Sequence, residues 1–454
     1  MLRTSFLPEQ RMIRIFRRLV CATCLTCAFT PGGALSQNLD WRSTIESEWA
    51  ASSSEGGLKK SEFVFRTELE GGLGDWGSFT IIGQLRADPV DELEPGRADA
   101  SNDVRGPLNR RGFIGDGVDA ELREAYLDIY AGRGFWRIGK QQVVWGQADG
   151  LRVLDAVNPL QFREFILGDF EDRRIPLWMV NYERPVGDAV LQLLWVPDHT
   201  YDDLPGEGAF AVTSARSAPS IPEGIEGGVT LEQTDRPDRF IVDDDYGVRL
   251  SGFTSGWDWS LNYLYTYSDE RVLHREITAS ETLTVRPGYE RTHLIGGSGS
   301  NAFGKVTLRL EAGWFSDRFL IVDDPVDRDG VAVSQELRYV IGADYQLDGD
   351  TLLSAQVFQS HLLDRPGAAR RDKSETSFTL LARRAYHNNT IEAEGLLIGS
   401  ADNGDGVLQL SLDYELSDSV SVGAGADLFF GDSDGLYGQF DSADRITLSF
   451  SYDF

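Results

Sequence analysis

The sequence predicts an all-β fold: a transmembrane, antiparallel, up-and-down β-barrel of about 18 strands, with 16 strands as the alternative. Three observations predict it. Strand-length segments alternate apolar and polar side chains along most of the chain, the connections between them alternate between short and long, and the chain ends in an aromatic strand. This combination is typical of barrels that cross a bacterial outer membrane.

The first 36 residues have the composition of a secretory signal peptide. Basic residues precede an apolar run from Leu19 to Phe29, and the small residues Ala34-Leu35-Ser36 follow. We therefore expect residues 1–36 to be removed on export and residues 37–454 to form the barrel. All three cysteines lie in this leader, so disulfides and thiolate metal sites are not expected in the mature protein.

The chain is strongly acidic. Its net charge of −29 becomes −33 without the leader, because the leader holds five Arg and one Glu. A surface this acidic makes nucleic acid an unsuitable partner. After the leader, no window holds the roughly 18 apolar residues that a transmembrane helix needs.

The last strand has two distinct faces. In DRITLSFSYDF, Ile446, Leu448, Phe450, Tyr452 and Phe454 share one face, opposite Thr, Ser and Asp side chains. A lipid-facing strand with a polar inner face requires this strict alternation. The terminal Phe also resembles the C-terminal signal of bacterial outer-membrane barrels.

The same alternation places 18 strands along the chain. Every second connection is a tight turn, whereas the others include the long segments 88–119, 146–175, 198–244, 269–288 and 317–332. Short periplasmic turns and long extracellular loops fit this sorting. The predicted strands lie near 39–50, 60–71, 76–87, 120–131, 134–145, 176–184, 187–197, 245–254, 256–268, 289–298, 303–316, 333–346, 350–362, 374–386, 389–400, 405–416, 419–431 and 443–454.

A barrel of this size is too wide for side chains to fill, so it encloses an aqueous lumen unless a segment plugs it. The inward face is expected to be polar and mixed in charge. Opposing charges can favour particular solutes or simply neutralise one another in a rigid wall. The predicted charged residues of the lumen wall are Arg66, Arg86, Arg249, Arg309 and Glu311.

The stretch GKQQVVWGQADGLRVLDAVNPLQ, residues 139–161, breaks the strand pattern. Strict alternation would place Lys140 in lipid, at a cost of about 2–4 kcal/mol near the midplane. A β-bulge at Gly139 would turn Lys140 into the lumen. Eleven large apolar residues follow within residues 146–175, a density that does not suit a solvated surface loop.

We therefore expect loop 146–175 to fold into the barrel, with a short helix ending near Gly168, and to constrict the channel. The alternative is a lid that packs on other extracellular loops. Loop 198–244, which lacks periodicity, is expected to be mobile. The polar residues predicted to line or anchor the constriction are Lys140, Asp149, Arg152, Asp155, Asn158, Arg163, Arg173 and Arg174.

The 139–161 stretch resembles the hallmark of a widespread family of uncharacterised Gram-negative outer-membrane proteins that share a domain of unknown function. The matching residues are Gly139, Gln141, Val144, Trp145, Gly146, Asn158 and Pro159. The resemblance implies an outer-membrane location, contact with outer-membrane lipid and lipopolysaccharide, and association with inner-membrane exporters of the resistance-nodulation-division type. It implies no catalytic residues.

Other functions find little support in the sequence. The five histidines are scattered, without metal-ligand spacing or a Gly-x-Ser-x-Gly elbow, so an enzyme and a cofactor are not expected. Acidic loops near Asp323 and Asp402 could hold calcium, but solvated surface is the favoured interpretation. The expected function is a porin-like channel for a small or amphipathic solute; the alternative is a plugged barrel that docks components of an envelope export system.

Overall fold

The computed structural model describes residues 39–53, 56–97, 104–212, 228–277, 282–323 and 329–454. The predicted signal peptide, residues 1–36, lies outside these residues.

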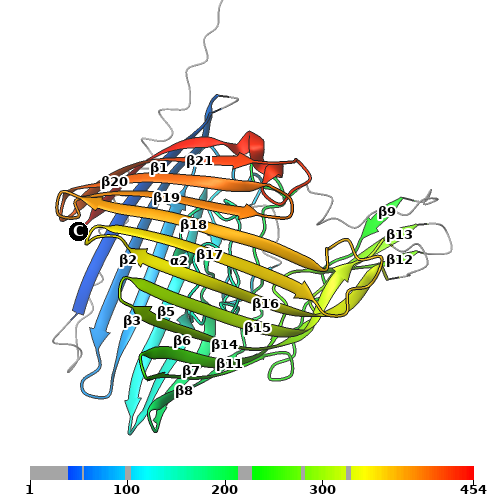
Figure 1. Cartoon of the computed structure of the whole chain (residues 1–454), viewed down its shortest axis with the longest axis horizontal. Coiled ribbons are helices and arrows are strands. Elements are labelled where there is room, and N and C mark those ends of the chain that lie inside the picture. The colour runs from blue at the N-terminus through cyan, green and yellow to red at the C-terminus, as the bar shows by residue number, and fades with distance from the viewer. Residues whose placement is uncertain (1–38, 54–55, 98–103, 213–227, 278–281, 324–328) are drawn as a thin grey trace, which may run out of the picture. The chain divides into compact units, whose positions relative to one another are not determined.

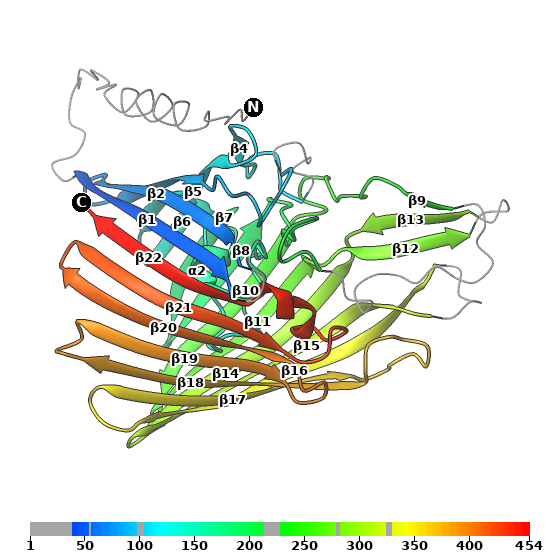
Figure 2. The same cartoon turned by 90° about the horizontal axis from the view of Figure 1, so that it is seen from above.

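The chain forms a closed antiparallel barrel of 18 strands, as predicted, and the 16-strand alternative is wrong. Closure is made by pairing of the first and last strands, β1 and β22, from Thr44 opposite Asp453 to Ser52 opposite Arg445, and Figure 2 shows these two strands side by side. The barrel strands are β1 Leu39–Ser52, β2 Leu58–Gly72, β3 Gly77–Ala87, β5 Val118–Ala131, β6 Gly134–Gln141, β7 Leu177–Val186, β8 Ala189–Val196, β10 Asp245–Thr254, β11 Trp257–Tyr267, β14 Arg291–Phe303, β15 Val306–Ile321, β16 Val331–Gln346, β17 Thr351–Leu362, β18 Ser374–Tyr386, β19 Ile391–Ser400, β20 Gly406–Ser417, β21 Val420–Phe430 and β22 Arg445–Asp453.

The two faces of the wall differ as the alternation predicts. On β22, Ile446 and Leu448 are more than half exposed on the outside. On β11, Leu261 is exposed whereas its neighbours Ser260 and Asn262 are buried on the inside. Large apolar side chains on an outer surface are stable only against lipid, so this distribution fits a transmembrane barrel.

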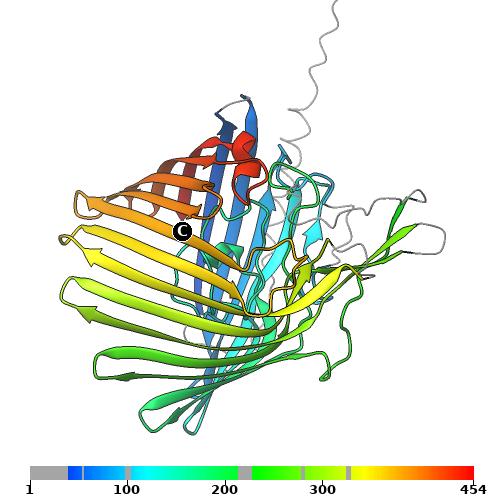
Figure 3. The same ribbon diagram turned by 45° about the vertical axis from the view of Figure 1, so that its right-hand side comes forward.

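The short and the long connections lie at opposite ends of the barrel. One end carries tight turns, such as residues 132–133 between β5 and β6 and residues 255–256 between β10 and β11, and Figure 3 shows several of these turns together. The turn between β18 and β19 holds His387, Asn388 and Asn389 at positive φ, which asparagine tolerates better than most residues. The opposite, extracellular end carries the long loops.

Two of these long loops contain ordered segments. Residues 269–288 contain a hairpin, β12 (Val272–Ile277) and β13 (Leu283–Gly288), which forms a small sheet with β9 (Val229–Leu231) outside the barrel (Figure 1). The expectation that loop 198–244 is mobile is wrong for its first part, because Tyr201 and Phe210 are almost fully buried. Burial of apolar and aromatic side chains can hold a segment in one conformation even where its sequence has no periodicity.

The bulge expected at Gly139 lies on the neighbouring strand. The register between β3 and β5 shifts at Arg123, so that Leu122 pairs with Gly83 and Glu124 with Ile82. β6 pairs with β5 without interruption up to Lys140. Gly139 instead has a φ of 135°, and a Cβ at this position would lie 2.1 Å from the carbonyl oxygen of Ala125.

Candidate functional site

Loop 146–175 lies within the barrel. Its first half contributes Val153, Leu154 and Val157 to an apolar cluster with inward residues of the wall from β7 to β17. Leu154 is fully buried and packs so closely against β14 and β15 that a Cβ on Gly296 would lie 2.4 Å from its side chain. This half of the loop is therefore fixed to one side of the wall.

The second half of the loop reaches a different part of the wall. Phe165, Ile166 and Leu167 pack in a second apolar cluster with inward residues of β19 to β21, Leu93 and Phe210. The ring of Phe165 lies 4.7 Å from that of Phe440, which belongs to the 3₁₀-helix Gly438–Ala443. The loop thus spans the barrel interior between two parts of the wall.

The only helix of the loop is α2, Phe170–Arg173. It begins after Gly168, which has a φ of 79°, rather than ending there as expected. A glycine in the left-handed region turns the chain before the helix. Arg173 follows with its guanidinium over the rings of Phe162 and Phe170, at 5.6 and 5.2 Å.

Three residues of the 139–161 stretch fix the points where the loop leaves and rejoins the wall. The side chain of Asn158 accepts a hydrogen bond from the main-chain N–H of Val143 and donates one to the carbonyl of Ile175. The amide of Gln141 donates to the carbonyl of Arg137. Trp145 is fully buried, and its Nε1 donates to Gln192 at 2.8 Å. These contacts give the motif a structural purpose.

Charged contacts tie the first half of the loop to β15. Arg309 donates to the carbonyl of Gln147 at 2.7 Å and pairs with the carboxylate of Asp149 at 2.5 Å. Glu311, which is 3% exposed, accepts hydrogen bonds from the main-chain N–H groups of Gln147 and Leu154. Both predicted wall residues therefore bind the loop.

Charged contacts tie the second half to β2 and β22. Arg163 pairs with Glu62 of β2, and Glu164 pairs with Lys60 of β2 at 2.7 Å and with Arg445 of β22 at 2.5 Å. In the closed ring of 18 strands, eight strands separate β2 from β15 in either direction. The two strands are therefore diametrically opposite. The loop is anchored on opposite sides of the barrel.

The other predicted residues have mainly local roles. Arg174 pairs with Asp155 at 2.7 Å, and Arg152 donates to the carbonyl of Asn158, so these contacts hold the loop's own fold. Arg66 pairs with Asp172 at 2.5 Å. The two remaining wall residues contact other segments: Arg86 lies 3.5 Å from Glu62, and Arg249 donates to the carbonyl of Val144.

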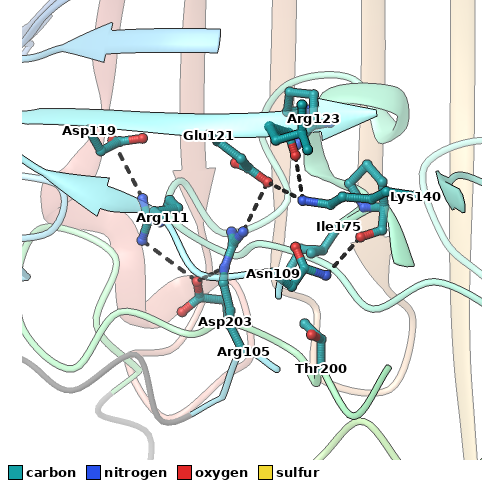
Figure 4. A network of polar contacts seen from close by, with 12 residues as sticks. Arg105, Asn109, Arg111, Asp119, Glu121, Arg123, Lys140, Ile175, Thr200 and Asp203 are labelled. Atoms are coloured by element: carbon teal, nitrogen blue, oxygen red, sulfur yellow. Dashed lines mark hydrogen bonds and ion pairs between the residues drawn. The ribbon is translucent and has the colours of Figure 1, made fainter. Parts of the chain in front are cut away.

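Within the part of the chain that the structure describes, Lys140 forms no hydrogen bond or ion pair with the inserted loop. Its Nζ donates to the carbonyl of Leu122 at 2.5 Å and lies 3.5 Å from Glu121. It belongs to a buried network, shown in Figure 4, in which Arg105 lies between Glu121 and Asp203 at 3.0 and 3.2 Å. Sequence reasoning missed this network because its members come from β5, β6 and two long loops.

Burial also affects acidic side chains beside the inserted loop. Burial raises the pKa of Asp202 to about 6, although Arg152 and the N–H of Leu160 oppose the shift. Burial, followed by the charge of Asp202, raises the pKa of Asp269 well above its usual value. These residues line a cavity of about 70 Å³ between the loop and the wall.

Among the described residues, no group of three or more His, Cys, Asp or Glu side chains has the geometry to hold a metal ion. None of the helices in the described ranges combines the length and apolar run that crossing a membrane requires.

Comparisons with solved structures give the same fold. The chain is similar to Acinetobacter baumannii OccAB2 (TM-score 0.53, 10% identity, 93% of this chain and 99% of that one). It is also similar to Pseudomonas aeruginosa OccK8 (OprE), with a TM-score of 0.52, 9% identity and coverage of 93% and 99%. A BenF-like porin from Pseudomonas fluorescens Pf-5 aligns with a TM-score of 0.51, 10% identity and coverage of 93% and 100%. The fold is that of an outer-membrane porin.

Sequence comparison adds the family. No curated protein matches the chain. Residues 111–399, which include the 139–161 stretch, match a family model described as "Protein of unknown function (DUF1302)". Because this match covers more than half of the 454 residues, the chain belongs to the DUF1302 family.

Proposed function

We propose that the protein is a non-enzymatic outer-membrane channel that passes a small or amphipathic solute and is narrowed by loop 146–175. The observation that carries the proposal is the anchoring of this loop on β2 and on β15, which are opposite in the ring. A segment fixed at both sides reduces the open cross-section of a wide barrel without depending on loop mobility.

Solvent-exposed charges support an aqueous path past the loop. The inward side chains Arg383 of β18 and Glu392 of β19 keep 45% and 47% of their surface exposed, and Asp172 of α2 keeps 52%. Charged side chains in a filled core would be buried and paired. Their exposure therefore favours a narrowed channel over a plug.

The test is single-channel conductance of the mature chain in planar bilayers, beside a variant that lacks residues 148–172. A modest conductance that increases several-fold on deletion is expected. Ala355→Trp is the matched control, because Ala355 lies on the outer face of β17 and should leave the conductance unchanged. A wild-type chain that folds, shown by its heat-modifiable mobility, but carries no current would contradict the proposal.

The second candidate function is a plugged barrel that docks components of an export system, such as an inner-membrane exporter of the resistance-nodulation-division type. The two apolar clusters and the buried ion pairs of the loop favour it, since they would also suit a permanent plug. Absence of current from the wild type, combined with a large current from the variant that lacks residues 148–172, would support this function over the channel.

A further inference from the structure

The barrel wall is unusually short at β6 and β8. Each has 8 residues, whereas a transmembrane strand needs about 9–11. At a rise of about 3.3 Å per residue and a tilt of about 45°, eight residues cover roughly 19 Å of an apolar band about 25 Å tall. Neighbouring β5 has 14 residues and continues well beyond the end of β6.

The upper part of β5 consequently lacks a full partner. On the edge that faces β6, pairing stops at Ala125, and the two-residue strand β4, Gly112–Phe113, pairs only with Asp119 and Ala120. Among the described residues, no strand covers residues 121–124 on this edge. The carbonyl of Leu122 is satisfied by the side chain of Lys140 instead. A main-chain edge at membrane depth normally has a strand partner, so the wall is interrupted here.

Charged side chains fill the interruption rather than apolar ones. Figure 4 shows Arg105, Arg111, Arg123 and Lys140 around three carboxylates, those of Asp119, Glu121 and Asp203. Arg123 donates to three main-chain carbonyls and belongs to no ion pair of the described residues. Arg111 also pairs with Glu94 at 3.0 Å, so among the described residues Arg123 is the one of these four cations without a carboxylate partner.

Several buried atoms of this network have no hydrogen-bond partner within the described protein. They include two donors, Arg105 Nη2 and Arg111 Nε, on side chains with no exposed surface. Buried guanidinium N–H groups require an acceptor. An anionic group that reached the network would supply an acceptor to Arg105 and Arg111 and a counter-charge to Arg123.

An apolar groove on the outer face of the barrel lies beside the interrupted part of the wall. It has a volume of about 510 Å³, within the range of small-molecule sites, and Ile81, Leu127, Ile138 and Trp178 line it around the small residues Ala125 and Gly139. Ala125 and Lys140 form the last pair of β5 and β6, so the groove ends where the wall is interrupted. Trp178 also donates to the carbonyl of Leu108, in the loop that bears Arg105.

We propose that the interrupted wall above β6 is a lateral passage between the lumen and the outer leaflet for an amphiphile with one apolar chain and an anionic head. The chain lies in the outer groove, and the head exchanges with the carboxylates around Arg105, Arg111 and Lys140. The proposal rests on the proposed channel function and specifies its solute class and its route.

Photo-crosslinking tests the site. The probe is a C12 alkyl sulfonate with a diazirine in its chain, added to the mature protein in phosphatidylcholine vesicles. Adducts are expected on Leu127 and Trp178, and Ala125→Trp should reduce them at least fivefold. Ala355→Trp is the control, because Ala355 lies in a second outer groove, of about 470 Å³, at a continuous part of the wall. Adducts spread evenly around the barrel, or equal labelling in both variants, would overturn the proposal.

A disulfide lock tests the passage. Gly112 and Ala120 are direct cross-strand partners, and the chain has no cysteine after Cys27, so Gly112→Cys with Ala120→Cys would tie β4 to β5. Transfer of a fluorescent C12 sulfonate across the vesicle membrane should fall about tenfold when the pair is oxidised and recover with reductant. Ser377→Cys with Ser400→Cys, a cross-strand pair of β18 and β19, is the control.

Conductance measured on the same locked protein separates the two proposals. Transfer that stops while ion conductance persists supports lateral passage. Transfer that continues in the locked protein, or that is lost together with conductance, overturns lateral passage. The proposed channel function is then tested by the conductance of the wild type alone. Absence of conductance in the wild type with lock-sensitive transfer would refute the aqueous channel but support the lateral route.

Discussion

Glu164 and Lys60 form an ion pair of 2.7 Å between the tip of the inserted loop and the second strand of the barrel. The other carboxylate oxygen of Glu164 binds Arg445 on the last strand. One loop side chain therefore spans the seam where the first and last strands close the barrel. Burial opposes the charge of Glu164, but Lys60 and Arg445 outweigh it and hold the pKa of its carboxyl well below the usual value.

Glu164→Gln should loosen the seam and the loop together. The substitution leaves Lys60 and Arg445 buried with less compensating charge, and breaking a buried pair by removal of one partner typically costs about 3–5 kcal/mol. We expect a lower thermal midpoint in detergent, measured by calorimetry, and a larger conductance. Glu232→Gln, on the exposed small sheet outside the barrel, should change neither. An unchanged midpoint would show that the pair does not stabilise the seam.

Trp145→Ala should release the first half of the loop. Trp145 fills the apolar cluster and binds Gln192, and truncation of a buried Trp typically costs about 3–5 kcal/mol. We expect a several-fold increase in conductance, with more current noise, in planar bilayers. Trp41→Ala, at a residue 67% exposed on the outer face, is the matched control. Equal currents from both variants would contradict a narrowing role for this half of the loop.

Asp202→Asn should stabilise the protein at neutral pH but not at low pH. The pKa of Asp202 is raised to about 6 in the folded protein, above an unfolded value of about 3.9. As the pH rises between these values, the unfolded chain ionises while the folded protein keeps its proton, so stability falls, by about 3 kcal/mol in full above pH 6. Asparagine removes this penalty and still accepts the hydrogen bond from Leu160.

The measurement is the thermal midpoint of both proteins at pH 3.5 and pH 7.5. The variant should be more stable only at the higher pH. Asp188→Asn, at an exposed turn residue, should show no such difference. Equal midpoints of Asp202→Asn and wild type at pH 7.5 would contradict a pKa of Asp202 that burial has raised.

The channel should prefer cations. The inward carboxylates of Glu392, which is exposed, and Glu394, which is half-buried, share one arginine, Arg383, at 3.5 and 2.6 Å, which leaves an excess of negative charge on this part of the wall. Like charges along a lumen attract counter-ions. Replacement of both glutamates by Gln should shift the reversal potential in a salt gradient toward anions. Replacement of the outer residue Leu410 by Ala should leave it unchanged.

The sequence predicted the barrel because strand alternation is a local property. The alternation within each strand predicts which face is apolar, and the length of each connection predicts at which end of the barrel it lies. The 18 strands and the assignment of connections to the two ends could therefore be predicted without tertiary information. The apolar residues of loop 146–175 likewise required burial, which favoured a position inside the barrel. Its helix and the bulge were misplaced, because both depend on packing against neighbouring segments.

Local residue patterns were enough to predict the fold, the two faces of the wall and the segment that occupies the lumen. The pairing of charged side chains became clear only from the three-dimensional arrangement of the strands and loops. Arg105, Glu121, Lys140 and Asp203 have no common spacing, and their pairing depends on β6 ending early and on two long loops that fold over the resulting interruption. Ion pairs between distant segments are set by strand register and loop path, which local patterns of residues do not encode.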